Sequence, residues 1–96
     1  MEIFKKKLNE EERYLMSLSI DTYREHYPTY SKEHPRKLML TVWKMDLSKD
    51  HSLTVYDEIE ADFLLSVIFH YFDYVKNGRE DMILHDLYNE IREYFF

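Results

Sequence analysis

Four side chains that can ligate a metal or move a proton follow one another at helical spacing. They are Asp62, Ser66, His70 and Asp73, separated by four, four and three positions. In a helix these spacings place all four along one face, where two or three of them could bind a metal ion. Further ligands from a second helix would be needed, and no HExxH, ExxH or paired-histidine motif supplies them. We therefore interpret the four as a solvated polar stripe and expect neither a metal nor a cofactor.

The histidines show no catalytic pattern. The chain has five, scattered over expected helix ends, loops and polar faces: His26, His34, His51, His70 and His85. A catalytic histidine needs a nucleophile or a carboxylate held beside it, and the spacing in this sequence does not demonstrate one. The GxSxG, P-loop and dinucleotide-binding motifs are also missing from the sequence. We expect a non-catalytic protein, with a small metal-dependent enzyme centred on His70 and Asp73 as an alternative.

The charge of the chain is unevenly distributed. Residues 1–47 carry nine Lys and Arg against eight Asp and Glu, whereas residues 48–96 carry four against eleven, for a total of -6. An acidic half repels phosphate backbones, so we expect no direct binding to nucleic acid and a basic protein partner instead. The alternative is an acidic mimic of nucleic acid that blocks a DNA- or RNA-binding protein.

Length and composition indicate one small domain over residues 1–96. The sequence has no cysteine, one Gly and two Pro. Without cysteine there is no disulfide or zinc-thiolate site, which favours a reducing compartment, and we expect a cytoplasmic protein. No segment reaches the roughly 18 uninterrupted apolar residues of a membrane span, so no membrane partner is expected.

The sequence predicts an all-α fold, a bundle of about four helices. A capping box formed by Asn9 and Glu12 begins a helix over 10–26, and Pro35 suits the first position of a second helix over 35–47. Thr54 as an N-cap predicts a third helix over 54–77, closed by Gly78 in a left-handed conformation. The fourth helix covers 80–95. A β-hairpin within 37–56, pairing 37–46 with 52–56, is the alternative.

The third predicted helix has more apolar side chains than one face can hold. Its stretch DFLLSVIFHYFDYV, residues 62–75, contains ten apolar or aromatic side chains in fourteen positions. In a helical projection, Phe69 lies within the polar stripe and Leu65 lies at its border. The helix over 10–26 also has a second apolar side, which includes Tyr23 and Tyr27. Uncovered apolar faces of this kind indicate interaction sites, including contacts with a second copy.

Aromatic residues are numerous, with nine Tyr, six Phe and one Trp. Most stripe positions should fill the core, namely Phe63, Tyr71, Phe72, Leu87 and Ile91. The short segment FKKKL near the N-terminus should be a solvated tail. Tyr and Trp concentrate at interfaces because they combine a large contact area with a polar tip. The predicted partner-binding residues are Tyr23, Tyr27, Tyr30, Trp43, Glu58, Asp62, Leu65 and Phe69.

These observations lead to one functional expectation. We expect a small regulator or inhibitor that binds a protein partner through an aromatic surface rimmed by acidic residues. We also expect it to form a homodimer, because a second copy can cover apolar faces that one chain leaves open.

Overall fold

The structure, a computed structural model, describes residues 3–27 and 35–96. In chain order these residues form strand β1 (Phe4–Lys7), helices α1 (Glu10–His26) and α2 (Pro35–Lys49), strand β2 (Ser52–Val55), helix α3 (Glu58–Tyr71), the 3-10 helix η1 (Phe72–Tyr74) and helix α4 (Gly78–Phe95). The predicted four-helix architecture is confirmed, and β1 and β2 add a small antiparallel sheet to it.

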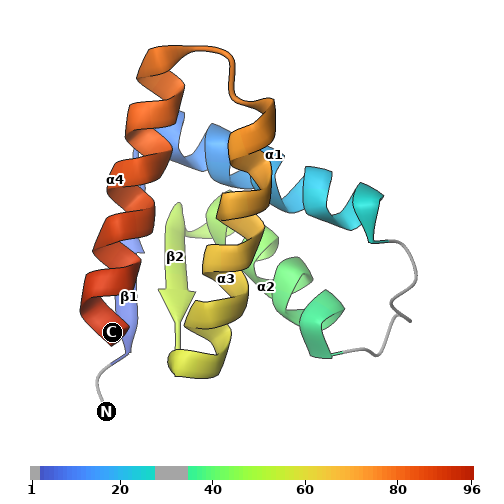
Figure 1. Ribbon diagram of the computed structural model, residues 1–96. Coiled ribbons are helices and arrows are strands. Elements are labelled where there is room, and N and C mark those ends of the chain that lie inside the picture. The colour runs from blue at the N-terminus through green and yellow to red at the C-terminus, as the bar shows by residue number, and fades with distance from the viewer. Residues whose placement is uncertain (1–2, 28–34) are drawn as a thin grey trace.

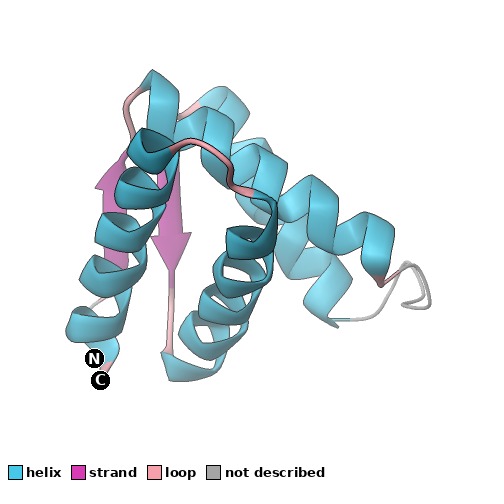
Figure 2. Cartoon of the chain, turned by 45° about the horizontal axis from the view of Figure 1, so that its top comes forward, coloured by secondary structure: helices cyan, strands magenta, loops and turns pink. Residues whose placement is uncertain are grey.

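The helices pack around the short sheet. Figure 1 shows α3 and α4 running antiparallel, with α1 crossing behind α3. Helix α1 contacts α2, α3 and α4, and helix α2 packs on β2. The two strands lie side by side next to the pair formed by α3 and α4 (Figure 2). Ile3, the first described residue, lies beside the C-terminal end of α4, where the Tyr94 hydroxyl donates to its carbonyl.

Helix α1 begins where the sequence predicts. The backbone N–H of Glu12 donates to Asn9 Oδ1 at 2.8 Å, and the backbone N–H of Asn9 donates to Glu12 Oε1 at 3.0 Å. This reciprocal capping box satisfies two backbone donors that the first turn leaves without partners. Its second apolar side is covered over most of its length, because Met16, Ile20 and Tyr23 are buried in the core, whereas Tyr27 at its end is exposed.

Helix α2 confirms the helical interpretation of the ambiguous segment, and the alternative hairpin within 37–56 is wrong. The chain is helical from Pro35 to Lys49, two residues beyond the predicted end. After it, His51 adopts a positive φ of 55°, a left-handed conformation in which His is more common than most other non-glycine residues. That turn leads directly into β2.

The partner of β2 is the segment that we expected to be a solvated tail, and that expectation is wrong. Phe4 pairs with Val55 and Lys7 with Ser52, in antiparallel register. Phe4 and Leu8 are buried, because alternation in β1 turns Phe4 toward the core while Lys5 and Lys7 face solvent. The FKKKL segment therefore forms part of the fold.

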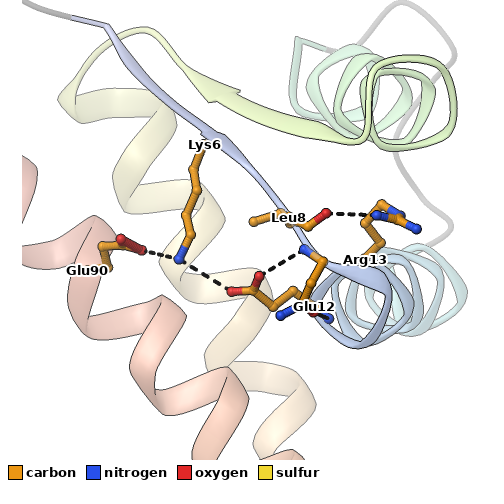
Figure 3. Close-up of polar contacts among 6 residues, drawn as sticks. Lys6, Leu8, Glu12, Arg13 and Glu90 are labelled. Carbon is orange, nitrogen blue, oxygen red and sulfur yellow. Dashed lines mark hydrogen bonds and ion pairs between the residues drawn. The ribbon is translucent and has the colours of Figure 1, made fainter.

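Lys6 connects β1 to two helices (Figure 3). Its Nζ lies 2.7 Å from Glu90 Oε2 on α4 and 3.4 Å from Glu12 Oε2 on α1. Partial burial lowers the pKa of Lys6, but the hydrogen bond to Glu90 and the negative charges of Glu12 and Glu90 outweigh that effect and raise it above its ordinary value. The charged form of Lys6 is thus stabilised in the folded protein.

The predicted ends of the third helix are wrong. Thr54 lies in β2, and α3 begins after Asp57, whose side chain accepts the backbone N–H of Glu60 at 2.8 Å. Helix α3 ends at Tyr71 and passes into η1 rather than continuing to residue 77. Gly78 does not have positive φ and begins α4, where Asn77 is the N-cap. The fourth helix thus starts two residues earlier than predicted.

The buried core largely matches the apolar stripes. Phe63, Tyr71, Leu87 and Ile91 are buried as predicted, and Phe72 is half-buried against the core. The core extends to residues of β1, α2 and β2, where it includes Phe4, Leu8, Leu40, Trp43, Leu47, Leu53 and Val55. One continuous core thus joins all four α-helices and the sheet.

Candidate partner-binding groove

An open groove of about 940 Å³ lies across the outer faces of three helices. We call it the aromatic groove, because five of its lining residues are Tyr or Phe. It is lined by Tyr23, Tyr27, Asp62, Leu65, Ser66, Phe69, His70, Asp73, Tyr88, Arg92 and Phe96.

Phe69 of α3 is the most unusual residue in this groove. Its side chain is 64% exposed, although it lies on a helix whose other aromatic side chains, Phe63 and Tyr71, are buried. Its ring contacts Phe72 at 5.9 Å and Tyr88 of α4 at 6.5 Å between centroids. The exposed position follows from the helical period, because Phe69 falls on the polar stripe between the faces that pack on α1 and α4.

The carboxylates of that stripe flank Phe69. Asp62 and Asp73 are exposed and line the groove on either side of it in sequence. Glu58 is exposed one turn before Asp62 and extends the acidic row beyond the groove lining. Ser66 satisfies its hydroxyl locally by donating to the carbonyl of Asp62 at 3.0 Å. The α3 wall therefore offers one large apolar ring between negative charges.

The C-terminal end of α1 supplies a stacked pair of rings. Tyr23 and Tyr27 lie 4.4 Å apart with an interplanar angle of 27°. Tyr23 is buried and also packs edge-on against Phe63 at 5.4 Å, whereas Tyr27 is exposed. The buried ring thus anchors the exposed one, and Tyr27 reaches the edge of His70 at 5.6 Å. This end of the groove is built from fixed aromatic rings.

Helix α4 forms the remaining wall. Tyr88, Arg92 and Phe96 recur every four residues and therefore lie along one face near the C-terminus. Phe96 is largely exposed, and the Arg92 side chain places one positive charge at this wall. The groove consequently combines aromatic surface with two carboxylates and a single guanidinium.

Two histidines meet where α1 and α3 approach each other. His26 Nδ1 lies 2.7 Å from His70 Nε2, and the hydroxyl of Tyr74 in η1 lies 3.1 Å from the same His26 nitrogen. The histidine rings are perpendicular, with centroids 4.9 Å apart. This cluster borders the groove through His70.

A second apolar depression, of about 490 Å³, lies between α2, β2 and the start of α3. We call it the α2 surface. Burial raises the pKa of Glu60 at its edge, and the nearby charge of Asp57 acts in the same direction against a backbone hydrogen bond that lowers it. It is lined by Pro35, Leu38, Met39, Val42, Trp43, Thr54, Tyr56, Asp57, Ile59 and Glu60.

The structure brings five of the eight predicted partner-binding residues together in the aromatic groove. These are Tyr23, Tyr27, Asp62, Leu65 and Phe69. Glu58 is exposed next to the groove. Trp43 is not the exposed anchor that we expected, because only 1% of it is accessible and it packs in the core. Tyr30 lies outside the described residues.

The sequence did not predict the α4 wall or the contact between His26 and His70. The four-residue spacing of Tyr88, Arg92 and Phe96 is visible in the sequence, but only the packing of α4 beside α3 brings it to the groove. Nothing local pairs His26 with His70, which lie 44 positions apart.

In residues 3–27 and 35–96, no three His, Asp or Glu side chains lie together in a way that could hold a metal ion. Within the same described ranges, none of the helices combines the length and apolarity that crossing a membrane requires.

Comparisons of the chain with models of known protein families, with curated proteins and with solved structures found no match. The residues of the site therefore carry the functional argument alone.

Proposed function

We propose that this chain is a small non-catalytic regulator or inhibitor that binds a basic, amphipathic helix of a partner protein in its aromatic groove. The observation that carries the proposal is Phe69, which is 64% exposed in a groove whose other walls are also aromatic. A large ring exposed to water loses the free energy that burial of its apolar area would give, about 25 cal/mol per Å². A partner that covers Phe69 recovers that free energy.

The groove has the composition of an interaction hot spot. Tyr and Arg are enriched in such spots, and aromatic residues are enriched in interface cores. Tyr27, Phe69, Tyr88 and Phe96 supply aromatic area, and Arg92 supplies a planar hydrogen-bonding group. Several of these rings are already held by neighbouring rings, so binding orders few side chains.

Charge favours a basic occupant. Asp62 and Asp73 line the groove and Glu58 extends the row, whereas Arg92 is the only Lys or Arg among the described residues that line it. The segment 48–96, which contains α3 and α4, carries four Lys and Arg against eleven Asp and Glu. A partner with Lys or Arg beside its apolar anchors gains electrostatic attraction, mainly in the rate of association.

Shape favours a helix. One wall is formed by Asp62 and Phe69 of α3, and the facing wall by Tyr88 and Arg92 of α4, which runs antiparallel to α3. Two helices side by side form an elongated depression that accepts the apolar face of a third helix, a common mode of peptide recognition. We therefore infer a helical rather than an extended occupant.

A nuclear magnetic resonance titration tests the proposal. The probe is a short synthetic amphipathic peptide of Leu and Lys, with a Leu and Glu analogue as the charge control. We expect saturable shifts at Leu65, Phe69 and Arg92 with the basic peptide. Phe69→Ala should weaken binding about 30-fold, the effect of losing a hot spot of about 2 kcal/mol. Met82→Ala, at a similarly exposed residue outside the groove lining, should have little effect.

The outcomes separate the proposal from its alternatives. Equal binding of the acidic peptide, or shifts confined to other surfaces, would overturn it. Binding that disappears with added salt but ignores Phe69→Ala would instead support an acidic mimic of nucleic acid. Far-ultraviolet circular dichroism of both variants must match the wild type, so that a change in binding does not reflect unfolding.

We also propose that two copies pair through the α2 surface. Leu38, Val42, Tyr56 and Ile59 are each about half exposed or more, and Ile59 reaches 76%. A two-fold axis would place these apolar side chains of one copy against the same set in the other copy.

Sedimentation equilibrium tests the pairing. We expect a mass of twice the 12.0 kDa chain mass and dissociation on Ile59→Glu, which places an acid in the first turn of α3 without disfavouring the helix. Phe69→Ala should leave the dimer intact. A wild-type mass equal to one chain at all concentrations would refute self-association while leaving the groove proposal standing.

We place the protein in the cytosol, because the sequence has no cysteine for the disulfides that small secreted domains usually need. We assign no reaction, because the groove residues lack a nucleophile held by a base in the arrangement that covalent catalysis requires.

A further inference from the structure

A third depression, of about 420 Å³, lies between the first half of α1 and the second half of α2. We call it the basic pocket, because Arg13, Lys44 and His51 line it and Glu10 is the only Asp or Glu among the described residues that do so. It shares no described lining residue with the aromatic groove, and its charge is opposite. Its volume lies within the range of about 300–1,000 Å³ that is usual for small-molecule sites.

The pocket is formed by corresponding faces of two helices that pack on each other. Arg13 and Ser17 of α1 are four residues apart, and so are Lys44 and Ser48 of α2. Residues at this spacing lie on the same side of a helix, so each helix contributes one cation and one hydroxyl to the shared space. His51 follows α2 in the turn with positive φ and adds an imidazole.

The basic side chains are held by contacts that leave hydrogen-bond donors available. Arg13 Nη1 donates to the carbonyl of Leu8 at 2.8 Å (Figure 3), and the backbone N–H of Leu8 donates to the carbonyl of His51 at 2.8 Å. Leu8 thus connects Arg13 with His51. Lys44 pairs with Asp21 of α1. A guanidinium has five N–H groups and an ammonium three, so both side chains are positioned and still able to donate to a ligand.

The two hydroxyls of the pocket differ from other helical hydroxyls of this chain. Ser19, Thr41 and Ser66 each donate to the backbone carbonyl four residues earlier, at 2.8–3.0 Å. Ser17 and Ser48 make no such bond to any of the described residues. Their O–H groups are therefore available to an acceptor from outside the chain.

We propose that the basic pocket binds a small molecule through a phosphate group. A phosphate group carries about two negative charges and three strong acceptor oxygens. The planar fork of a guanidinium such as Arg13 pairs with two of these oxygens, and an ammonium such as Lys44 adds a point charge. Ser17 and Ser48 supply donors for the remaining oxygen positions. This site is separate from the groove, so the proposal does not depend on the protein partner.

A nuclear magnetic resonance titration at constant ionic strength tests the site. The probes are inorganic phosphate, glycerol 3-phosphate and uncharged glycerol. We expect saturable shifts at Ser17, Ser48 and His51 with glycerol 3-phosphate, at an affinity no lower than that of inorganic phosphate, and none with glycerol. Binding of inorganic phosphate alone would mean an adventitious ion only and would overturn the proposal, as would shifts that do not saturate.

Variants assign the binding to this pocket. Arg13→Gln should weaken binding of glycerol 3-phosphate about tenfold or more, the effect of losing a hydrogen bond to a charged group. Ser48→Ala should weaken it about fivefold, the effect of an ordinary hydrogen bond. The second variant keeps the contact between Arg13 and Leu8, so it tests the site even if the first disturbs the fold.

Lys49→Gln is the matched control. It removes one positive charge, as Arg13→Gln does, at an exposed residue next to Ser48 that is not among the described residues lining the pocket. The affinity should be nearly unchanged. Equal losses in Lys49→Gln and Arg13→Gln, or unchanged affinity in both Arg13→Gln and Ser48→Ala, would show general charge attraction and overturn the proposal. Circular dichroism confirms that each variant is folded.

Discussion

Two aromatic residues that the sequence presented as equal candidates for an interface have opposite positions in the molecule. Trp43 on α2 is 1% exposed, stacks on Phe63 at 5.8 Å and donates its indole N–H to the carbonyl of Thr54 at 2.9 Å. Phe69 on α3 is 64% exposed and contacts the rings of Phe72 and Tyr88. One ring belongs to the core and the other to the surface.

The difference comes from what lies opposite each residue. Trp43 faces β2, whose carbonyl satisfies the indole and whose position is fixed by pairing with β1. Phe69 has the half-buried rings of Phe72 and Tyr88 beside it, and the described residues leave 64% of it exposed. A helical projection tells which side of a helix a residue occupies, but burial depends on the element that packs there.

The largest expected effect separates these two positions directly. Trp43→Ala should lower the free energy of unfolding by about 4 kcal/mol, because it opens a cavity in the core. Phe69→Ala should change it by less than about 0.5 kcal/mol, as is usual at exposed sites. Urea denaturation followed by circular dichroism measures both. Similar losses for the two variants would mean that Phe69 contributes to the core and would remove the main support for the groove.

Trp43→Phe sharpens the result. This variant keeps most of the ring volume but leaves the carbonyl of Thr54 without its donor, which should cost about 1–3 kcal/mol. A loss as large as that of the alanine variant would show that the hydrogen bond, rather than packing, fixes the indole.

The next prediction concerns β1, the strand that pairs with β2 and so positions β2 against Trp43. Phe4→Ala should destabilise the protein by about 3 kcal/mol, because the Phe4 ring is buried and packs edge-on against Tyr94 at 5.2 Å. Ile3→Ala, at the half-exposed neighbouring residue, should have little effect. Thermal unfolding monitors both variants. Equal stabilities would mean that β1 contributes nothing to the core.

A smaller effect is expected from the charge that joins β1 to the helices. Lys6→Met keeps the apolar stem but removes the ion pairs with Glu12 and Glu90, and should cost about 1 kcal/mol or less. The folded pKa of Lys6 is raised, so its contribution is complete below the unfolded pKa and is lost only as the pH rises through the folded value. Chemical denaturation near neutral pH detects it, with Lys5→Met as the exposed control. A loss equal to that of the control would contradict a specific role for the triad.

The sequence was most informative where local chemistry fixes structure. Asn9 with Glu12 and Pro35 correctly predicted the starts of α1 and α2. The sequence also contains the signal for the start of α3, because Asp57 precedes Glu60 by three residues and acts as the N-cap of the helix. Thr54 was predicted as the N-cap in its place. The sheet could not be predicted, because β1 and β2 are four-residue strands far apart in the chain. The three lysines in β1 also suggest a solvent-exposed segment. Segments of four residues are too short for their sequence pattern to predict which distant segment they pair with.

The candidate site shows the same limit. The polar stripe of residues 62–73 predicted an exposed Phe69 between acidic residues, because these residues are close in sequence and recur at helical spacing. The contributions of α4, and the approach of His26 to His70, depend on how separate helices pack and could not be read from spacing. Trp43 was misplaced for the same reason, since the strand that covers it had not been recognised.

The smallest expected effect belongs to the exposed ion pair at the starts of α1 and α4. Arg79 donates to Glu11 from Nε at 3.0 Å and from Nη2 at 2.5 Å. That hydrogen bonding lowers the pKa of Glu11, so the pair stabilises the fold above the unfolded pKa of Glu, about 4.3, and loses its effect as the pH falls through the lower folded value. The stability difference between the wild type and Arg79→Gln should therefore shrink on acidification, as measured by urea denaturation at a series of pH values.

Glu10→Gln controls for the general benefit of an acid in the first turn of α1. A difference that stays constant with pH would show that Arg79 acts through something other than Glu11. Because both side chains are largely exposed, added salt should reduce the effect further.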